Sequence, residues 1–213
     1  MRSIFIAALT LLATVSCSAN GGTKQVNKEA ETNETSNQTT YMEKKGKALV
    51  VFFSHAGENY SVGVIEVGNT KIVADYISEQ TGADQFEIVA EKSYDMPYSQ
   101  LIKVAQDEER KGELPAYKGQ VPDLAQYDTI FIGGPIWWGT YPRVMFTFFR
   151  DNDLSGKTLI PFSTHEGSGL GNVVSDVKKA YPKATVTGQF SIAGHDVRSG
   201  KASVQRWLNS LGY

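Results

Sequence analysis

Two adjacent tryptophans, Trp137 and Trp138, are the most distinctive residues of this chain that could do chemistry. They follow the apolar run 129–132, whose β-branched and aromatic residues are typical of a buried strand in a parallel sheet. We expect this strand to end at 133–135, Gly-Gly-Pro, and the indoles to lie on the loop that follows. Ligands of open α/β sheets bind where strands end, so the indoles could form a platform for a flat ring. The alternative is that both are core aromatics under a long connection.

A second candidate loop follows the apolar run 47–53 and begins with Ser54-His55-Ala56-Gly57. Gly68-Asn69-Thr70 then opens a helical pattern that Gly82 ends. Backbone N–H groups at a helix N-terminus, joined by serine and threonine hydroxyls, suit a phosphate group. The alternative is a plain strand-to-helix connection with Asn69 as the helix N-cap. The chain has neither a Walker lysine nor Gly-x-Gly-x-x-Gly here, so a P-loop nucleotide and a Rossmann dinucleotide are not supported.

The third candidate loop is 163–169, Ser-Thr-His-Glu-Gly-Ser-Gly, which follows the apolar run 158–162. It offers small hydroxyls and backbone N–H groups to the polar edge of a ligand. His165 and His55 are candidates to touch that ligand, although a solvated loop histidine is the more common case. Glu166 is a candidate proton donor, and His195 is expected on the surface.

Hydrophobic periodicity supplies the elements that carry these loops. We expect a helix at 98–111, ended by Gly112, whose charged run 107–111 lies on its solvated face. Five strands alternating with five helices predict an α/β fold, a doubly wound parallel sheet with helices on both faces. The remaining helices are marked by Ile72-Val73-Tyr76-Ile77, Val144-Met145-Phe148-Phe149, Val173-Val174-Val177 and Val204-Trp207-Leu208-Leu211, and the expected strands are 47–53, 85–89, 129–132, 158–162 and 184–189.

The three loops are expected to meet at one edge of this sheet. With the strand order 2-1-3-4-5, strands one, three and four are neighbours, and their loops converge at the switch point between one and three. One loop suits a phosphate, one a flat aromatic ring and one the polar edge of that ring. Flavin mononucleotide (FMN) has all three parts.

These motifs, in this order, resemble the flavodoxin family over about 47–211. The family's phosphate loop, Ser/Thr-x-Thr-Gly-Asn-Thr, is matched in two halves separated by 57–67, which looks like an insertion. The stretch 135–139 is similar to the second flavin loop, where Trp137 best fits the indole that covers one face of the isoalloxazine. Long-chain flavodoxins have a tyrosine over the opposite face of the isoalloxazine. The stretch 163–169 has no tyrosine, so that face would be covered by His165 or exposed to solvent. The resemblance implies FMN as cofactor and these binding residues: Ser54, Ala56, Asn69, Thr70, Pro135, Ile136, Trp137, Trp138, Gly139, Thr140, Ser163, Thr164, His165, Gly167, Ser168 and Gly169.

The N-terminal segment resembles the signal of a bacterial lipoprotein. The apolar run 4–15 is too short to span a bilayer, and Leu-Leu-Ala-Thr-Val-Ser-Cys is similar to a lipobox that ends in Cys17, with Thr14 departing from the usual Leu, Val or Ile. We therefore expect a signal peptide at 1–16, a lipidated Cys17, a disordered tether at 17–45 and a flavodoxin-like domain at 46–213. Cleavage by the ordinary signal peptidase beyond Ser16 is the alternative. The expected location is the cell envelope, with the protein anchored to the membrane.

Composition narrows the function. Cys17 is the one cysteine, so disulfides and thiolate metal sites are excluded, and a net charge of −2 argues against a nucleic-acid partner. The leading hypothesis is an FMN protein that transfers electrons, as a carrier or as a reductase of quinone-like acceptors, with a redox partner protein or such a small molecule as partner. The alternatives are an NAD(P)H-dependent FMN reductase or quinone oxidoreductase, and a flavin-free binding module with the same fold.

Overall fold

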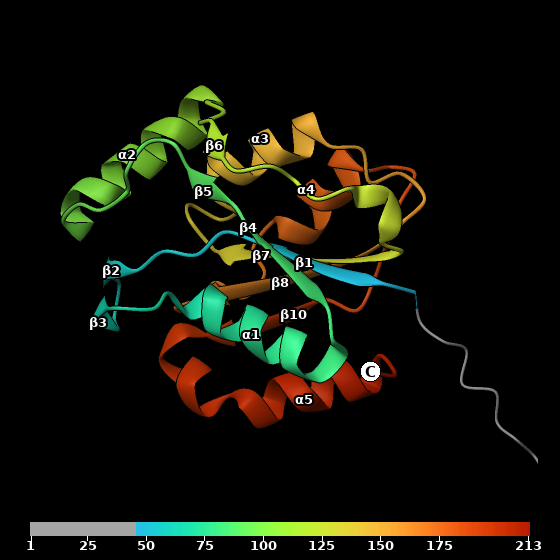
Figure 1. Ribbon diagram of the computed structural model, residues 1–213. Helices are drawn as coiled ribbons and strands as arrows, with labels where there is room; N and C mark the ends of the chain where they lie inside the picture. The colour runs from blue at the N-terminus through green and yellow to red at the C-terminus, as the bar shows by residue number, and fades with distance from the viewer. Residues whose placement is uncertain (1–45) are drawn as a thin grey trace, which may run out of the picture. The chain divides into compact units, whose positions relative to one another are not determined.

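The computed structural model describes residues 46–213, and its centre is the expected parallel sheet (Figure 1). The strand order is β4-β1-β7-β8-β10, which in chain order is 2-1-3-4-5. All four neighbouring pairs are parallel. The prediction of a doubly wound α/β fold is therefore confirmed. The strands are β1 (Ala48–Phe52), β4 (Asp84–Glu87), β7 (Thr129–Pro135), β8 (Thr158–His165) and β10 (Phe190–Ala193).

Two hydrophobic cores lie on opposite faces of the sheet, because successive strand residues point to opposite sides. In β1, Leu49 and Val51 face one core, whereas Val50 and Phe52 face the other. Helices α2 (Tyr98–Lys111), α3 (Arg143–Asp151) and α4 (Val173–Ala180) cover the first face, and α1 (Asn69–Thr81) and α5 (Lys201–Ser210) cover the second (Figure 1). The sheet is buried on both sides, which explains its continuous apolar runs.

The strand at 129–132 does not end at the glycines, contrary to expectation. β7 continues through Gly133 and Gly134 to Pro135, paired in register with β8. The glycines serve close packing: a Cβ on Gly133 would lie 1.9 Å from Cζ of Phe162, and one on Gly134 would lie 2.7 Å from Sδ of Met145. β8 likewise extends beyond Phe162 to His165, so the first part of the third candidate loop is strand.

The fifth strand is displaced from the predicted 184–189. The chain forms a short β9 (Thr185–Val186) beside β8, turns at Gly188 with φ of +63°, and pairs again as β10. The insertion at 57–67 is also ordered, as a hairpin of β2 (Gly57–Asn59) and β3 (Gly63–Ile65). A second small pair joins β5 (Val89–Ala90) to β6 (Tyr117–Lys118), and the 3-10 helices are η1 (Leu124–Gln126) and η2 (Gly194–Ser199).

Helix α2 has the predicted bounds, but its charged run is not wholly solvated. Glu108 is only 1% exposed and faces the core beside Tyr94. Periodicity accounts for this, because Glu108 shares the face of Leu101 and Ala105 at helical spacing.

The predicted signal peptide, Cys17 and tether lie outside the described residues. Within 46–213 no helix is both long enough and apolar enough to cross a membrane.

Candidate functional site

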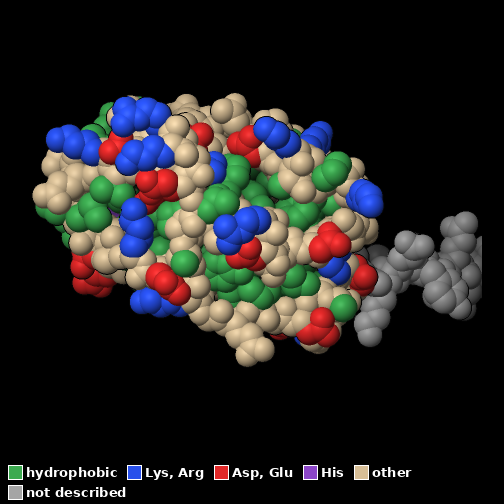
Figure 2. Space-filling view, turned by 90° about the horizontal axis from the view of Figure 1, so that it is seen from above, with side chains coloured by type: hydrophobic (Ala, Val, Ile, Leu, Met, Phe, Trp, Pro, Cys, Tyr) green, Lys and Arg blue, Asp and Glu red, His purple; other side chains and the backbone are tan. Residues whose placement is uncertain are grey.

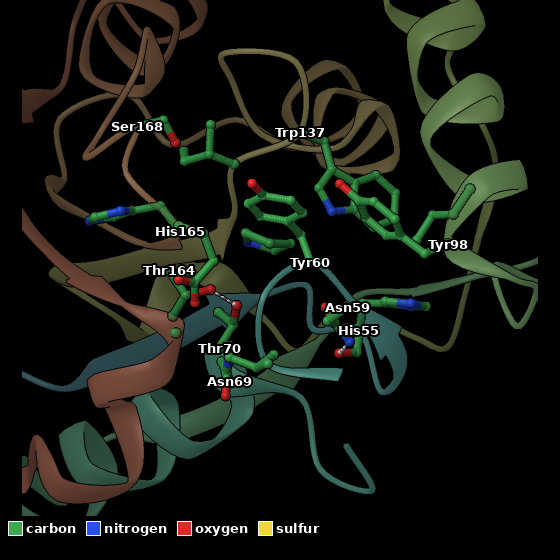
Figure 3. A pocket seen from close by; sticks show the side chains of 16 residues that line it. His55, Asn59, Tyr60, Asn69, Thr70, Tyr98, Trp137, Thr164, His165 and Ser168 are labelled. Atoms are coloured by element: carbon green, nitrogen blue, oxygen red, sulfur yellow. Dashed lines mark hydrogen bonds between the residues drawn. The ribbon is translucent and has the colours of Figure 1, made fainter. Parts of the chain in front are cut away.

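A cavity opens where β1, β7 and β8 end, as the strand order requires. Aromatic side chains gather at one end of it, from the β2–β3 hairpin, α2 and the loop after β7, while Asn69, Thr70 and Thr164 lie together at the other end (Figure 3). The cavity thus has an aromatic end and a polar end. Its lining residues are His55, Asn59, Tyr60, Val62, Asn69, Thr70, Tyr98, Leu101, Pro135, Ile136, Trp137, Thr164, His165, Glu166, Ser168 and Gly194.

Trp137 is fixed in the cavity wall by three edge-on ring contacts. Its ring centroid lies 5.2 Å from Tyr94, 5.5 Å from Phe53 and 5.8 Å from His55. Edge-to-face pairs of this kind contribute roughly 0.5–1.5 kcal/mol each beyond their buried area. The indole is therefore held in one orientation before any ligand arrives.

Trp138 points away from this cavity. Trp138 and Gly139 are the two central residues of a tight turn, with φ of +53° and +89° respectively. The turn is closed by a hydrogen bond in which Trp137 N donates to Thr140 O at 2.8 Å. Positive φ at both central residues is the type I′ pattern, which favours Asn-Gly and is unusual for a bulky side chain. The indole of Trp138 is 51% exposed, and its Nε1 donates to Ile102 O at 2.9 Å.

The N-terminus of α1 is capped by Ser54, which lies at the other end of the connection between β1 and α1. Gly68 is the N-cap and has no side chain to offer, and the Ser54 hydroxyl accepts instead from Lys71 N at 3.0 Å. A Cβ on Gly68 would come within 2.3 Å of Ser54 Oγ, so glycine is required for this approach. The N–H groups of Asn69 and Thr70, in the same first turn, remain available to an anion at the polar end.

The polar end is joined across the sheet by hydroxyl contacts. Thr70 Oγ1 and Thr164 Oγ1 lie 2.8 Å apart and both residues are buried, which ties α1 to β8 (Figure 3). Ser163 donates from its hydroxyl to Gly169 O at 2.9 Å and so closes the loop 163–169 on itself. These bonds order the loop but use two of its hydroxyls.

Glu166 brings a carboxylate to the cavity and is paired with His195. The carboxylate accepts from His195 N at 3.0 Å and lies 2.7 Å from His195 Nδ1. This hydrogen bond raises the pKa of His195 above its ordinary value, and the charge of Glu166 adds to the effect. A Cβ on Gly194 would lie 2.5 Å from Asn69 Nδ2 and 2.6 Å from Glu166 Oε1, so glycine leaves the space in which these side chains meet.

His55 is buried, at 8% exposure, between the cavity and the loop after β4. Its Nε2 has no hydrogen-bond partner among the described residues, and burial lowers the pKa of its ring below the ordinary value. Burial likewise lowers the pKa of His165. We therefore expect both rings to be neutral at pH 7. No group of three or more His, Cys, Asp or Glu side chains within 46–213 could hold a metal ion.

Comparison with known proteins identifies the fold's family. The flavodoxin family model matches residues 47–211. This chain belongs to the flavodoxin family.

Three solved structures that are similar to this chain are described as flavoproteins. A protein of Bacteroides eggerthii assigned as a flavoprotein is 28% identical with a TM-score of 0.62, over 79% of this chain and 99% of its own. Its counterpart from Bacteroides uniformis is also 28% identical, with a TM-score of 0.60 over 78% and 99% of the two chains. A flavoprotein of Lactobacillus acidophilus, solved in complex with FMN, shares the fold at 21% identity, with a TM-score of 0.55 over 76% and 98%. Comparison with curated proteins gave no match.

The flavodoxin-type site predicted from sequence is brought together only in part. Eight of the sixteen predicted binding residues line the cavity and eight do not. Among the latter, Ser54 caps α1, and Thr140 donates to Asp176 Oδ2 at 2.5 Å on the far side of its loop. The residues that line the cavity are Asn69, Thr70, Pro135, Ile136, Trp137, Thr164, His165 and Ser168, and those outside it are Ser54, Ala56, Trp138, Gly139, Thr140, Ser163, Gly167 and Gly169.

Sequence reasoning missed Tyr60 and Tyr98. Tyr60 lies at the turn of the hairpin and is 61% exposed, and its ring stacks on Tyr98 at 5.9 Å. Glu58 holds the hairpin to α2, because its Oε2 accepts from Tyr98 N at 2.7 Å. The available signal was the pattern 57–65, in which two short strand-like pieces flank Tyr-Ser-Val. Asn59, Val62, Leu101 and Gly194 were missed too, because nothing local marks them.

Proposed function

We propose that this chain binds FMN in the cavity and transfers electrons through it, as a carrier or as a reductase of quinone-like acceptors. The observation that carries the proposal is that one cavity is lined both by a fixed indole, Trp137, and by Asn69 and Thr70 in the first turn of α1, where N–H groups have no partner within the helix. FMN has a flat ring at one end and a phosphate at the other. The FMN complex of the Lactobacillus acidophilus protein, which has the same fold, supports this choice of ligand.

The residues present fit this cofactor. Trp137 would lie against the isoalloxazine, Asn69 and Thr70 would donate to the phosphate, and Thr164 and Ser168 would face the polar parts between them. Gly68 and Gly194 keep the polar end clear, because a side chain at either position would collide with Ser54 or with Asn69. FMN when bound supplies the redox chemistry, and the chain supplies position and polarity.

Glu166 is the feature least suited to a phosphate ligand. A carboxylate in the same cavity would repel an anion, but its pairing with His195 offsets part of that charge when the imidazole is protonated.

An absorption spectrum of the purified full chain tests the proposal first. After incubation with FMN, we expect the protein to show flavin absorption bands, with nearly every molecule carrying one FMN. We also expect FMN to bind more tightly than riboflavin, which lacks the phosphate. A colourless protein that binds neither flavin would overturn the proposal and favour a binding module without cofactor. Rapid bleaching on addition of NADPH would instead identify a nicotinamide-dependent reductase.

The envelope location is proposed on the sequence of the N-terminal segment. If Cys17 carries lipid, Cys17→Ala should move the protein from the membrane fraction to the soluble fraction and abolish incorporation of labelled palmitate, since two acyl chains are needed for stable anchoring. Membrane partition that does not change in Cys17→Ala would remove the anchor from the proposal.

A further inference from the structure

An apolar groove leads out of the cavity along α2. It is lined by the side of α2 that faces the β7 loop and by both tryptophans of that loop. Four of its residues also line the cavity, so the two spaces adjoin and share part of their wall. The shared residues are Tyr98, Leu101, Ile136 and Trp137, and those of the groove alone are Ile102, Ala105 and Trp138.

The groove offers no charge and little polarity. None of its seven lining residues is ionised at neutral pH, and the indole N–H of Trp138 already donates to Ile102 O. Its volume of about 320 Å³ falls within the usual range of small-molecule sites, roughly 300–1,000 Å³. From the side of α2, α3 and α4 the surface shows hydrophobic side chains in its hollows, surrounded by charged ones (Figure 2). Such a groove suits an apolar ligand.

The outer wall of the groove is held in an unfavourable backbone conformation. Trp138 has φ of +53°, a left-handed conformation that Asn and Gly adopt much more readily than a bulky residue. About half of its indole is exposed. A strained and exposed aromatic that contributes nothing to the core is accounted for when a ligand covers it.

We propose that this groove binds the aliphatic chain of a flat-ring electron acceptor, such as a prenylated quinone, whose ring enters the flavin cavity. The inference rests on the proposed function and names its substrate class. Because the groove adjoins the cavity at the residues that both share, one molecule with a ring at the cavity end and an apolar chain along the groove would contact both. Tyr60 and Tyr98, stacked at the junction, lie where that ring would pass.

A peptide is a poorer occupant of the same groove. Its backbone N–H and C=O groups would need partners when buried, and α2 uses its own backbone groups within the helix. An aliphatic chain brings no such groups. Each methylene that becomes fully buried strengthens binding by roughly fourfold, which is about 0.8 kcal/mol.

The test compares a methyl-substituted benzoquinone with the same ring carrying a decyl chain, each titrated by calorimetry into the FMN-loaded full chain. We expect the decyl compound to bind at least 10-fold more tightly, which corresponds to two or three buried methylenes. Trp138→Asn, which suits the left-handed turn, and Ile102→Gln should each remove fivefold or more of this preference. Binding of the chainless ring should stay the same.

Lys103→Gln is the matched control, because it places the same side chain on the exposed neighbour of Ile102. Equal affinity for the two quinones, or equal loss for both in the groove variants, would overturn the inference. If the chain takes up no flavin, the proposed function fails, and the same titration of the flavin-free protein still decides whether the groove prefers the decyl chain.

Discussion

The hydroxyl of Tyr94 donates to both carboxylate oxygens of Glu108, at 3.0 and 3.2 Å, behind the indole of Trp137. Lys92 also pairs with this buried carboxylate. A charged group is thereby held beneath the aromatic wall of the cavity, and the phenol ring that satisfies it also supports Trp137. Burial and the charge of Glu108 raise the pKa of Tyr94 far above its ordinary value, so Tyr94 remains a donor at every working pH.

Tyr94→Phe should therefore destabilise the fold without disturbing the flavin. The ring that supports Trp137 remains, but a buried carboxylate loses a donor, which costs about 1–3 kcal/mol of unfolding free energy. Chemical denaturation measures this loss, and FMN titration should give a dissociation constant within twofold of the parent. Tyr60→Phe, at an exposed ring, is the control and should leave stability unchanged. A stability loss under about 0.5 kcal/mol in Tyr94→Phe, the range of an ordinary surface substitution, would mean that water satisfies Glu108.

Trp137→Ala should weaken FMN and riboflavin alike. It removes ring stacking worth roughly 1–3 kcal/mol, by analogy with base–aromatic stacking, or roughly 5- to 150-fold in affinity. Flavin fluorescence quenched in the parent should reappear. Trp138→Ala is the comparison, because that indole lies outside the cavity. If Trp138→Ala weakens flavin binding and Trp137→Ala does not, the cavity wall is assigned to the wrong tryptophan.

Thr70→Ala and Ser54→Ala should discriminate between the two flavins. A hydrogen bond to a charged group contributes about 1.5–3 kcal/mol, so Thr70→Ala should weaken FMN by roughly 10- to 150-fold and riboflavin little. Ser54→Ala should also lower FMN affinity, and since Ser54 caps α1 it should cost about 0.5–2 kcal/mol of stability as well. Equal losses for FMN and riboflavin in both variants would show that this loop does not bind phosphate.

The pairing of His195 with Glu166 should appear as a pH dependence. Because the folded-state pKa of His195 is raised above 6.5, the pair stabilises the fold at low pH, and this contribution is lost as pH rises through the raised value. NMR titration of the three histidines should give His195 the highest pKa, with His55 and His165 below 6.5. Glu166→Gln should lower the pKa of His195 toward its ordinary value. An unchanged pKa in that variant would assign the shift to Asp196, which lies 3.6 Å from His195 Nε2.

Gly133→Ala should disrupt the sheet beside the site. The added methyl would lie 1.9 Å from the ring of Phe162 in the adjacent strand, and overpacking of this kind costs about 1–3 kcal/mol or more. Phe162→Leu in the same chain should restore part of the lost stability. Additive losses in the double variant would contradict this packing account.

The sequence by itself determined the fold class and the loops that follow the strands, whereas the strand order was expected from the resemblance to the flavodoxin family. Its apolar runs were long, its helical spacing was regular, and parallel strands at a switch point bring their loops together in a predictable way. The bounds of α2 and the stop of α1 at Gly82 followed from local capping chemistry. The loop that carries Trp137 and Trp138 could be named from its Gly/Pro residues and the preceding strand, whereas the choice of Trp137 over Trp138 came from the resemblance to the flavodoxin family.

Only the tertiary structure decided which side chain of each loop faces the cavity. The continuation of β7 through Gly133 and Gly134 could not be predicted, because glycine usually marks the end of a strand. In the structure the two glycines are needed because Phe162 and Met145 occupy the space that their side chains would fill. Glu108 was predicted to be solvated because it lies in a charged run, but its side of α2 packs against Tyr94, whose hydroxyl donates to it. Tyr60 and Tyr98 are 38 positions apart and become neighbours through the stacking of a hairpin on a helix, a long-range contact that no local pattern encodes.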